Sequence, residues 1–441
     1  MIDINSIDTI NIENLVNKTI ISSGKPTKLP VKDIIIADNP IDRFYESVCQ
    51  NIGKGLKILF LFGQEFEACA QKLKDYFEKR GFLSSEHIIQ DKRVKLASAQ
   101  QIASSIQDDT RIVIAIGGGS IIKIAKIASF LRGLPLALYY VTPECNQALT
   151  CYAQAYHNNL KTLYKTSGAE VICIDLSAIS QCNQNYIAGG VGILASKILA
   201  LFDWYFAHIF SLQQFDYQVS EAIFQELEKF MQFSQDLIKK DKKAYLELVH
   251  TQLKISALMH LSDNTALYEG GQVGALNVLE MFFYQEDRPL RLEGENLFLC
   301  SKIVLRAYKH WLNNLKLGYL SQPDNTLRIE KLTDFLGIDE LAALNNVLVI
   351  DDYEQWEIMQ YKWKEYNQDL IHKITQYSNL FAKYEHTFKR VYDDAGFWTT
   401  KYLTENDIML MIGLAPDTIN RFCLLSFVKL TGQLDKYLEG V

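Results

Sequence analysis

The sequence IVIAIGGGSIIKIAK, at residues 112–126, decides the fold. Its first five residues are apolar and mostly β-branched, which is typical of a strand buried on both faces. Three glycines and a serine follow, and residues 120–131 then show the apolar spacing of a helix. A strand, a glycine turn and a helix in this order predict one repeat of a parallel sheet with its connecting helix.

The same alternation extends over the first 180 residues. Including this strand, apolar runs that predict buried strands lie at 57–62, 111–116, 135–141 and 170–174, and residues 66–80 have helical spacing. After about residue 185 such runs nearly vanish, and long helical patterns follow at 191–210, 220–239 and 297–311. We therefore predict an α/β domain with a Rossmann-like parallel sheet at 1–180, an all-α domain at 181–441, and a cleft between them.

Composition narrows the class of protein. The chain has 441 residues, of which 48% are hydrophobic and 22% charged, a balance that excludes a disordered or fibrous protein. Its net charge of −7 argues against a general nucleic-acid binder. The N-terminus lacks a secretory pattern and the apolar runs are short, so we expect a cytoplasmic protein without a membrane span. The polar stretch 336–385 predicts one or two surface helices or an insertion.

The glycine loop is the main candidate for a binding site. Glycines allow a backbone to approach a ligand closely, and a helix N-terminus offers free N–H groups to a phosphate. Ser120 is suited to cap the helix or to donate to a phosphate. The spacing is neither GxGxxG nor a P-loop, so a tight turn without a ligand stays an alternative to a nucleotide or another phosphate-containing small molecule.

Several segments resemble one known family, in the same order along the chain. GGGSIIKIAK resembles the GGGSxxDxAK loop of the family of iron-type alcohol dehydrogenases, glycerol dehydrogenase, glycerol-1-phosphate dehydrogenase and dehydroquinate synthase. VTP at 141–143 is similar to the segment that borders the cofactor. GVGILASKILALFDW at 190–204 is similar to GxGDxxxKxxALxDW, and LEGE at 292–295 to LHGE. PDTINRFCLL at 416–425 resembles the closing helix of bacterial glycerol-1-phosphate dehydrogenases.

The resemblance implies a dehydroquinate synthase-like fold and a bound NAD or NADP. The cofactor residues that it implies are Gly117, Gly118, Gly119, Ser120, Lys123 and Thr142. It also implies a substrate pocket at Lys197, Asn277 and Glu293. We expect a homo-oligomer as well.

The departures from the family pattern concern its metal. The family holds one divalent metal with an Asp and two His, and these positions carry Ile193, Val273 and Glu293 here. A divalent ion needs three or four N, O or S donors. We therefore predict no metal. A second His, implied to touch substrate, falls on Asn277.

The cofactor side departs from the pattern too. The family's loop Asp is Lys123, and the Asp that ends the first strand is Gly63. The substrate-binding Asp after VTP is missing, and in residues 144–155 only Glu144 is acidic.

Two positions keep two interpretations each. Lys123 either extends along the helix surface to water or, with Ser120, holds a phosphate. Lys197 and Glu293 either form an ion pair in the space of the metal or make a polar site that works without metal.

Three functions follow from these observations. The first is a glycerol-1-phosphate dehydrogenase-like, NAD(P)-binding pseudoenzyme or divergent member without the metal. The second is a metal-independent NAD(P)-dependent oxidoreductase acting on an alcohol or a (phosphorylated) polyol. The third is a structural oligomer with an empty pocket. Fold alone does not decide among them.

Overall fold

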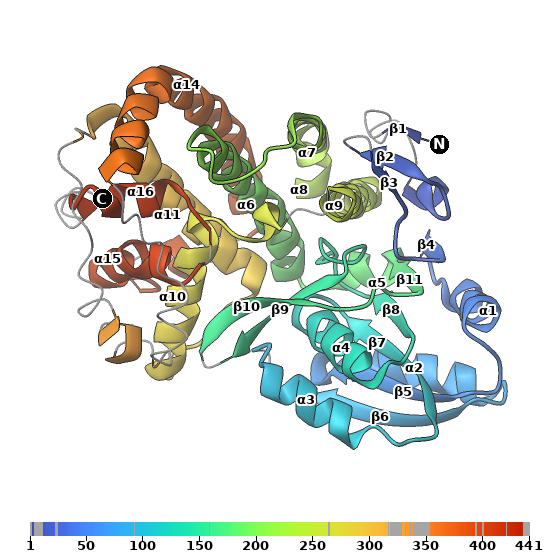
Figure 1. The fold of residues 1–441 in the computed structure, drawn as a ribbon. Helices are drawn as coiled ribbons and strands as arrows, with labels where there is room; N and C mark the ends of the chain where they lie inside the picture. Colours follow the sequence, from blue (N-terminus) through green and yellow to red (C-terminus); the bar gives the residue numbers. More distant parts are fainter. Residues whose placement is uncertain are drawn as a thin grey trace. The chain divides into compact units, whose positions relative to one another are not determined.

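A computed structural model shows a parallel β-sheet in the N-terminal part and helices in the C-terminal part (Figure 1). The described residues are 2–3, 12–22, 25–91, 93–157, 159–262, 265–315, 317, 329–330, 332–334, 337, 353–392, 395–398, 401–419 and 421–434. Three short strands near the N-terminus form a small sheet of their own: β1 Ile2–Asp3, β2 Ile20–Ser22 and β3 Lys25–Thr27.

The main sheet has six strands, and every pair of neighbours is parallel. The strands are β4 Asp33–Ala37, β5 Lys57–Gly63, β6 Leu83–Ile89, β7 Thr110–Gly117, β8 Leu136–Tyr140 and β11 Val171–Asp175. Their order is β4-β11-β8-β7-β5-β6. The chain therefore moves from β5 outward to β6 and then crosses back to β7, and at such a reversal parallel α/β sheets commonly bind ligands.

The predicted strands correspond to β5, β7, β8 and β11, and the α/β fold class is confirmed. They were recognisable because both of their faces are buried. The sequence analysis did not assign β4 and β6, which are the two edge strands. β6 reads LSSEHII and is partly exposed, so its sequence lacks the continuous apolar run of a central strand.

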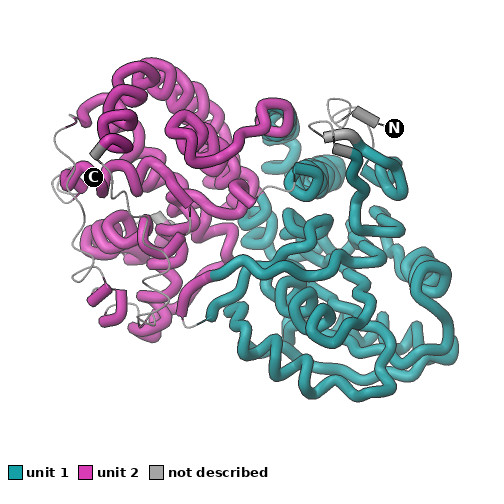
Figure 2. Tube along the Cα trace, viewed as in Figure 1, with its two compact units in different colours: residues 1–157, 162–190, 221–263 teal, residues 158–161, 191–220, 264–441 magenta. Residues whose placement is uncertain are grey.

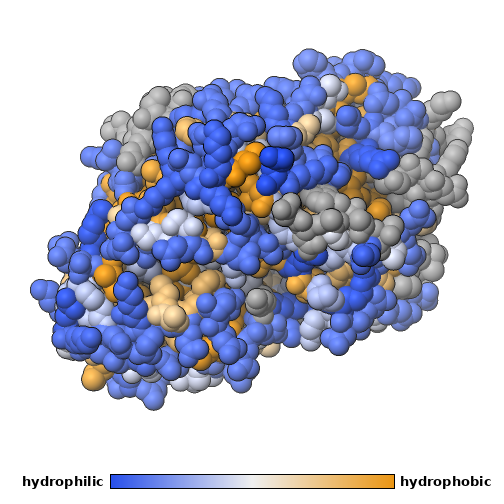
Figure 3. Space-filling view, turned by 180° about the vertical axis from the view of Figure 1, so that it is seen from behind, coloured by the Kyte–Doolittle hydropathy of each residue, from blue (hydrophilic) through white to orange (hydrophobic). Residues whose placement is uncertain are grey.

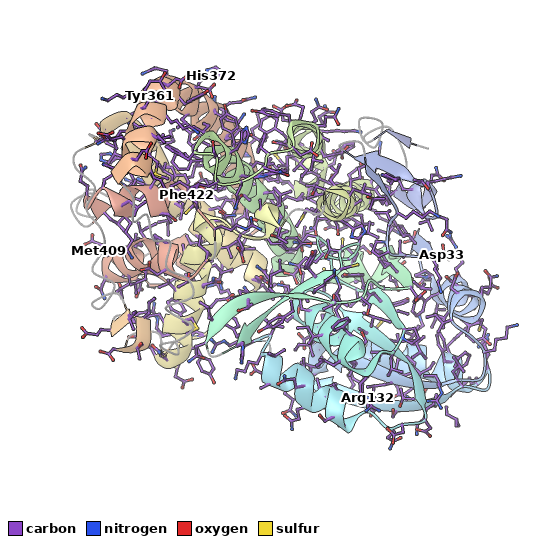
Figure 4. The ribbon with its side chains drawn as sticks, in the orientation of Figure 1. Asp33, Arg132, Tyr361, His372, Met409 and Phe422 are labelled. Carbon is purple, nitrogen blue, oxygen red and sulfur yellow. The ribbon has the colours of Figure 1, made fainter. Side chains whose placement is uncertain are left out.

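Helices cover both faces of the sheet. Helices α1 Ile41–Asn51 and α2 Glu67–Glu78 lie on one face, where Phe44 and Phe77 join Phe60 in one core. Helix α3 Leu96–Ser105 and helix α4 Gly119–Arg132 contact each other, and α4 packs on β7, β5 and β8. Arg132, labelled in Figure 4, is the last residue of α4, at the end opposite the glycine loop. Its Nη2 donates a hydrogen bond to Asp108 Oδ1.

The chain forms two compact units (Figure 2). The first unit comprises residues 1–157, 162–190 and 221–263, and it contains the main sheet. It also includes α8 Ser234–Ile238 and α9 Lys242–Leu261, so the unit that holds the sheet continues past residue 180. The division into domains at 180 and 181 stays a prediction.

The second unit comprises residues 158–161, 191–220 and 264–441. Its long helices are α10 Gly271–Gln285, α11 Glu293–Asn314, α14 Tyr353–Val391 and α15 Glu405–Leu414, followed by the shorter α16 Leu424–Leu430. The described part of residues 220–320 contains no strand, in agreement with the predicted helical region.

Helix α6, Gln184–Ile209, is the most apolar long helix. By length and composition alone it is long enough and apolar enough to cross a membrane, and it is the one such helix among the described residues. Its apolar window is completely buried inside the protein, as in the core helix of a globular domain, so it is weak evidence for a membrane span. The face drawn in Figure 3 is mainly hydrophilic, with hydrophobic residues in small separate areas.

Local differences from the predicted elements have simple causes. The predicted helix 220–239 is interrupted: α7 Tyr217–Phe230 ends in a 3-10 turn, Met231–Phe233, before α8 begins. Helical periodicity alone does not detect a single tighter turn. The two-stranded sheet of β9 Tyr152–His157 and β10 Leu160–Lys165 was not predicted, because polar residues interrupt both strands.

Helix α14 contains the described part of the polar stretch, apart from Gly337. One of its faces is not exposed, since Trp356 and Trp363 are buried and Trp363 stacks on Phe427. Residues 338–352 of the stretch lie outside the described residues.

Candidate functional site

The glycine loop joins β7 to α4. Gly117 has a φ of +145° and Gly119 a φ of +38°, conformations that L side chains rarely adopt. Helix α4 begins at Gly119, and its N-cap, Gly118, makes no side-chain capping bond. Ser120 is thus the second residue of the helix rather than its cap. Without a capping side chain, the first-turn N–H groups are suited to an anion.

Thr142 lies directly against this loop. A Cβ built on Gly118 would lie 2.0 Å from Thr142 Oγ1, so only glycine permits this approach. Val141 begins the segment that follows β8, here called the β8 loop. Its N–H donates to Gly117 O at 3.1 Å and fixes the start of this loop. Thr142 is fully buried, and its Oγ1 has no hydrogen-bond partner in the described part of the chain. A buried hydroxyl without a partner is uncommon and marks a place that a ligand oxygen could fill.

Glu144 closes the other side of the loop. Its main-chain oxygen accepts a hydrogen bond from Gly119 N at 3.4 Å. Its carboxylate Oε2 lies 2.9 Å from where a Cβ on Gly119 would be. The carboxylate is therefore beside the first residue of α4. Burial raises the pKa of Cys182 to about 12, and the negative charge of Glu144 adds to this rise.

Residues that follow the end of β5 also lie against the glycine loop. The Phe66 ring lies 3.1 Å from a Cβ built on Gly117. Tyr186, near the start of α6, stacks at a tilt on Phe66 and donates to Glu65 Oε1 at 3.4 Å. The carboxyl ends of three adjacent strands, β5, β7 and β8, thus bring an aromatic ring, a hydroxyl and carboxylates around the glycines.

Two lysines of α4 are buried. Lys123 is only 5% exposed, so its side chain does not extend along a solvated helix surface. Lys126 is completely buried, and its ammonium donates to the main-chain oxygens of Gln147, Thr150 and Tyr152 at 2.9, 2.5 and 3.0 Å. Burial lowers the pKa of Lys126 to about 7. The sequence analysis did not single out Lys126, although a cation among the apolar residues of a buried helix was a signal.

The predicted substrate residues belong to the second unit, and each has a partner there. Lys197 Nζ donates to Leu267 O at 2.7 Å. Asn277 Nδ2 donates to Thr418 O at 3.0 Å, whereas its buried Oδ1 has no partner within the described residues. The third residue, Glu293, accepts from the ammonium of Lys161 at 3.1 Å.

Lys161 is a residue that the sequence analysis missed. Its side chain is only 4% exposed, and its ammonium contacts Glu280 Oε2 at 3.5 Å as well as Glu293. Burial opposes the charge on Lys161, but the two carboxylates raise its pKa above the usual value. The cation beside Glu293 is therefore an ammonium from a strand far away in sequence.

The positions that the resemblance assigns to the family's metal ligands carry side chains that do not fit a divalent ion. Ile193 and Val273 are buried and offer only hydrocarbon, and Glu293 is paired with Lys161. Among the described residues no group of three or more His, Cys, Asp or Glu is placed to hold a metal. A cation held by one carboxylate that already has an ammonium partner would be poorly compensated.

Asp203, in register with the family's helix motif, accepts hydrogen bonds that connect several helices of the second unit. Its Oδ2 accepts from Gly271 N at 2.8 Å and from the Tyr308 hydroxyl at 3.1 Å, and its Oδ1 from Leu424 N at 3.3 Å. It thereby joins α6 to α11 and to the first turns of α10 and α16. Burial raises the pKa of Asp203 to about 7, although these three donors favour the carboxylate.

Comparisons with known proteins show what the chain is similar to. Residues 36–139 match the family model described as iron-containing alcohol dehydrogenase. The chain is 22% identical over 305 residues to the glycerol-1-phosphate dehydrogenase [NAD(P)+] of Bacillus velezensis, covering 66% of this chain and 75% of that protein. It is 23% identical over 287 residues to the protein of the same name from Pyrococcus horikoshii, covering 65% and 80%.

A solved structure shows the same fold. It is an archaeal halo-thermophilic alcohol dehydrogenase from a Red Sea brine pool, which superposes with a TM-score of 0.58 at 13% identity and covers 93% of this chain and 97% of that one. The resemblance read from the sequence is thereby confirmed: the chain has the fold of the iron-containing alcohol dehydrogenases and, at residues 36–139, the sequence pattern of that family.

Proposed function

We propose that the chain binds NAD(H) or NADP(H) at the glycine loop of its first unit and is a pseudoenzyme or divergent relative of glycerol-1-phosphate dehydrogenase that works without a divalent metal. The observation that carries the proposal is the buried, unpartnered Oγ1 of Thr142 against Gly118. Protein interiors rarely leave such a hydroxyl without an acceptor, and a phosphate oxygen supplies one.

The roles of the residues follow from their positions. Gly117, Gly118 and Gly119 let the pyrophosphate approach the backbone, and the positive end of the α4 dipole attracts it. Thr142 donates its hydroxyl to the same group. Ser120, in the first turn, has a hydroxyl that can donate, and the buried Lys123 supplies positive charge. A bound nicotinamide would supply the hydride acceptor or donor.

The proposed absence of metal-dependent turnover rests on the ligand positions that the resemblance implies. In a metal-dependent alcohol dehydrogenase the ion acts as a Lewis acid on the alcohol oxygen. Ile193 and Val273 remove two donors, and Lys161 neutralises the third position, Glu293. The chain's own residues therefore do not assemble that Lewis acid. Cytoplasmic location and homo-oligomer formation belong to the same proposal.

Calorimetric titration of the purified protein with NADH and NADPH tests the binding. We expect at least one of the two to bind, and we expect Gly118→Ala to abolish binding, because the added methyl would clash with Thr142 Oγ1. Gln100→Ala, at an exposed position of α3, is the control. If NADH, NADPH and simple nucleotides all fail to bind at millimolar concentration, the proposal is wrong and a structural role remains.

Turnover separates the pseudoenzyme from its alternative. The alternative is a metal-independent oxidoreductase that uses Lys197, Asn277 or Glu293. The buried Asn277 Oδ1 without a described partner favours it, because a substrate hydroxyl could donate to that oxygen. We expect no oxidation of glycerol 1-phosphate in the presence of chelator. Chelator-resistant turnover that Asn277→Ala removes would establish the alternative.

A further inference from the structure

Glu144 places a negative charge where the glycine loop would receive a ligand phosphate. Its Oε2 lies 2.9 Å from the position that a Cβ on Gly119 would take, and the residue is only 9% exposed. Gly119 is the first residue of α4, a helix of 14 residues, so this carboxylate is at the positive end of the helix. The unpartnered Thr142 Oγ1, completely buried, faces the same turn from the side of Gly118.

We propose that Glu144 is a specificity-determining residue of this loop, which makes the site select the pyrophosphate diester of a dinucleotide over a terminal phosphate. The inference rests on the proposed function, since it assumes that a nucleotide binds at the glycines. It adds the class of ligand and the residue that selects it.

The reason is electrostatic. A carboxylate near the N-terminus of a helix is stabilised by the helix dipole, as a bound phosphate is. A ligand phosphate must therefore displace this carboxylate or lie next to it. Each phosphate of a diester carries one charge, whereas a terminal phosphate carries a second ionisable oxygen near neutral pH. The repulsion is thus greater for ADP or ATP than for NADH.

The uncharged partners of the loop agree with this selectivity. Thr142 donates a hydrogen bond without adding charge, and Gly118 removes the steric barrier on that side. A diester can use both while keeping its charge low beside Glu144. The buried Lys123, to which the proposed function assigns the positive charge of this loop, attracts both kinds of phosphate, so the difference between them arises at Glu144.

The experiment compares NADH, ADP and ATP by calorimetry on the wild type and on Glu144→Gln. We expect the wild type to bind NADH more tightly than ADP or ATP. In Glu144→Gln the affinity for ADP and ATP should rise by about ten-fold or more, and that for NADH by less, because a close like charge has been removed. Glu46→Gln, which removes an exposed charge from α1, should leave all three affinities unchanged.

Thermal melting of each variant checks folding, and Glu144→Ser serves as a second neutral variant if Glu144→Gln is unstable. If the wild type binds NADH but the neutral variants keep the same ratio of ADP to NADH affinity, this inference is wrong and the proposed function stands. If neither the wild type nor the neutral variants bind any of the three ligands, the proposed function fails and the inference with it.

Discussion

The ammonium of Lys126, on α4, donates a 2.9 Å hydrogen bond to the main-chain oxygen of Gln147, in the segment that follows β8. The same ammonium reaches the main-chain oxygens of Thr150 and Tyr152. One side chain thus fixes the path of the segment that carries Glu144 toward the glycine loop. These acceptors are main-chain carbonyl groups, so hydrogen bonds to backbone dipoles stabilise the charge of Lys126.

Replacing Lys126 by Met should destabilise the first unit. The three carbonyl groups lose the one buried donor that they share, and leaving a buried polar group unsatisfied costs about 1–3 kcal/mol. We expect the free energy of unfolding, measured in urea, to fall by about 2–4 kcal/mol. Lys72→Met, at an exposed position of α2, is the control. Equal stability of the two variants would contradict the assigned role.

A comparison of the wild type with Lys126→Met at several pH values also tests the pKa of Lys126. The folded chain releases this proton near pH 7, whereas an unfolded lysine keeps it to about 10.5. Between these values the unfolded chain binds more protons, so the free energy of unfolding that Lys126 contributes rises with pH. The stability difference between wild type and Lys126→Met should increase from pH 7.0 to about 8.5. A difference that shrinks over this range would show that burial does not lower this pKa.

Asp203 should give the opposite pH dependence at lower pH. Its pKa is about 7 in the folded chain against 3.8 for the ordinary group, so the folded chain binds more protons between these values. Stability contributed by Asp203 should therefore fall as pH rises from about 4 to 7. Asp203→Asn should remove this slope and lower the free energy of unfolding by about 1–3 kcal/mol, because its amide nitrogen cannot accept from a main-chain N–H.

Asp287→Asn, at an exposed position, is the control for Asp203. It should preserve both the slope and the stability. Denaturation in urea at several pH values measures both quantities. An unchanged slope in Asp203→Asn would assign the pH dependence to other groups.

Thr142→Val should separate stability from binding. The hydroxyl has no partner among the described residues, so an isosteric methyl should leave the melting temperature of the free protein unchanged or slightly higher. The affinity for NADH should fall by about 3–10-fold, the value of one hydrogen bond. Thr142→Ser keeps the hydroxyl and should retain the affinity. A clear loss of stability in Thr142→Val would mean that the hydroxyl already has a structural partner.

The purified protein should contain no stoichiometric zinc, iron or nickel, and chelators should leave its melting temperature unchanged. Elemental analysis measures the first and thermal melting the second. Restoring Ile193→Asp, Val273→His and Glu293→His together should gain metal only when Lys161→Met is added, because the ammonium repels a cation. About one tightly bound metal per wild-type chain, lost in Glu293→Ala, would overturn the assignment.

The sequence predicted the fold well where burial is uniform. β5, β7, β8 and β11 are central or nearly central strands, so their apolar runs are unbroken. The edge strand β6 was not recognised, because an edge strand is in part exposed and keeps polar residues.

The site was less accessible to sequence reasoning. The glycines were proposed from a local strand–glycine–helix pattern and Thr142 from the family resemblance, and the structure places Thr142 against Gly118. The ion pair of Lys161 with Glu293 joins residues on β10 and α11, and no local pattern encodes such a contact. Glu144 was noted only as an acidic residue, since its position beside Gly119 depends on how the β8 loop folds back.

The order of the strands also has a consequence for how the chain folds during synthesis. β4, the first strand of the main sheet, pairs with β11, the last, in a register that sets Ile34 opposite Ile172. β5, β6, β7 and β8 can pair with one another as they leave the ribosome, whereas β4 must wait for residues 171–175. During that interval its apolar sequence, DIIIA, has no neighbouring strand, and unpaired strand edges of this kind favour aggregation. A nascent chain arrested before residue 171 is therefore the form of this protein that most needs a chaperone.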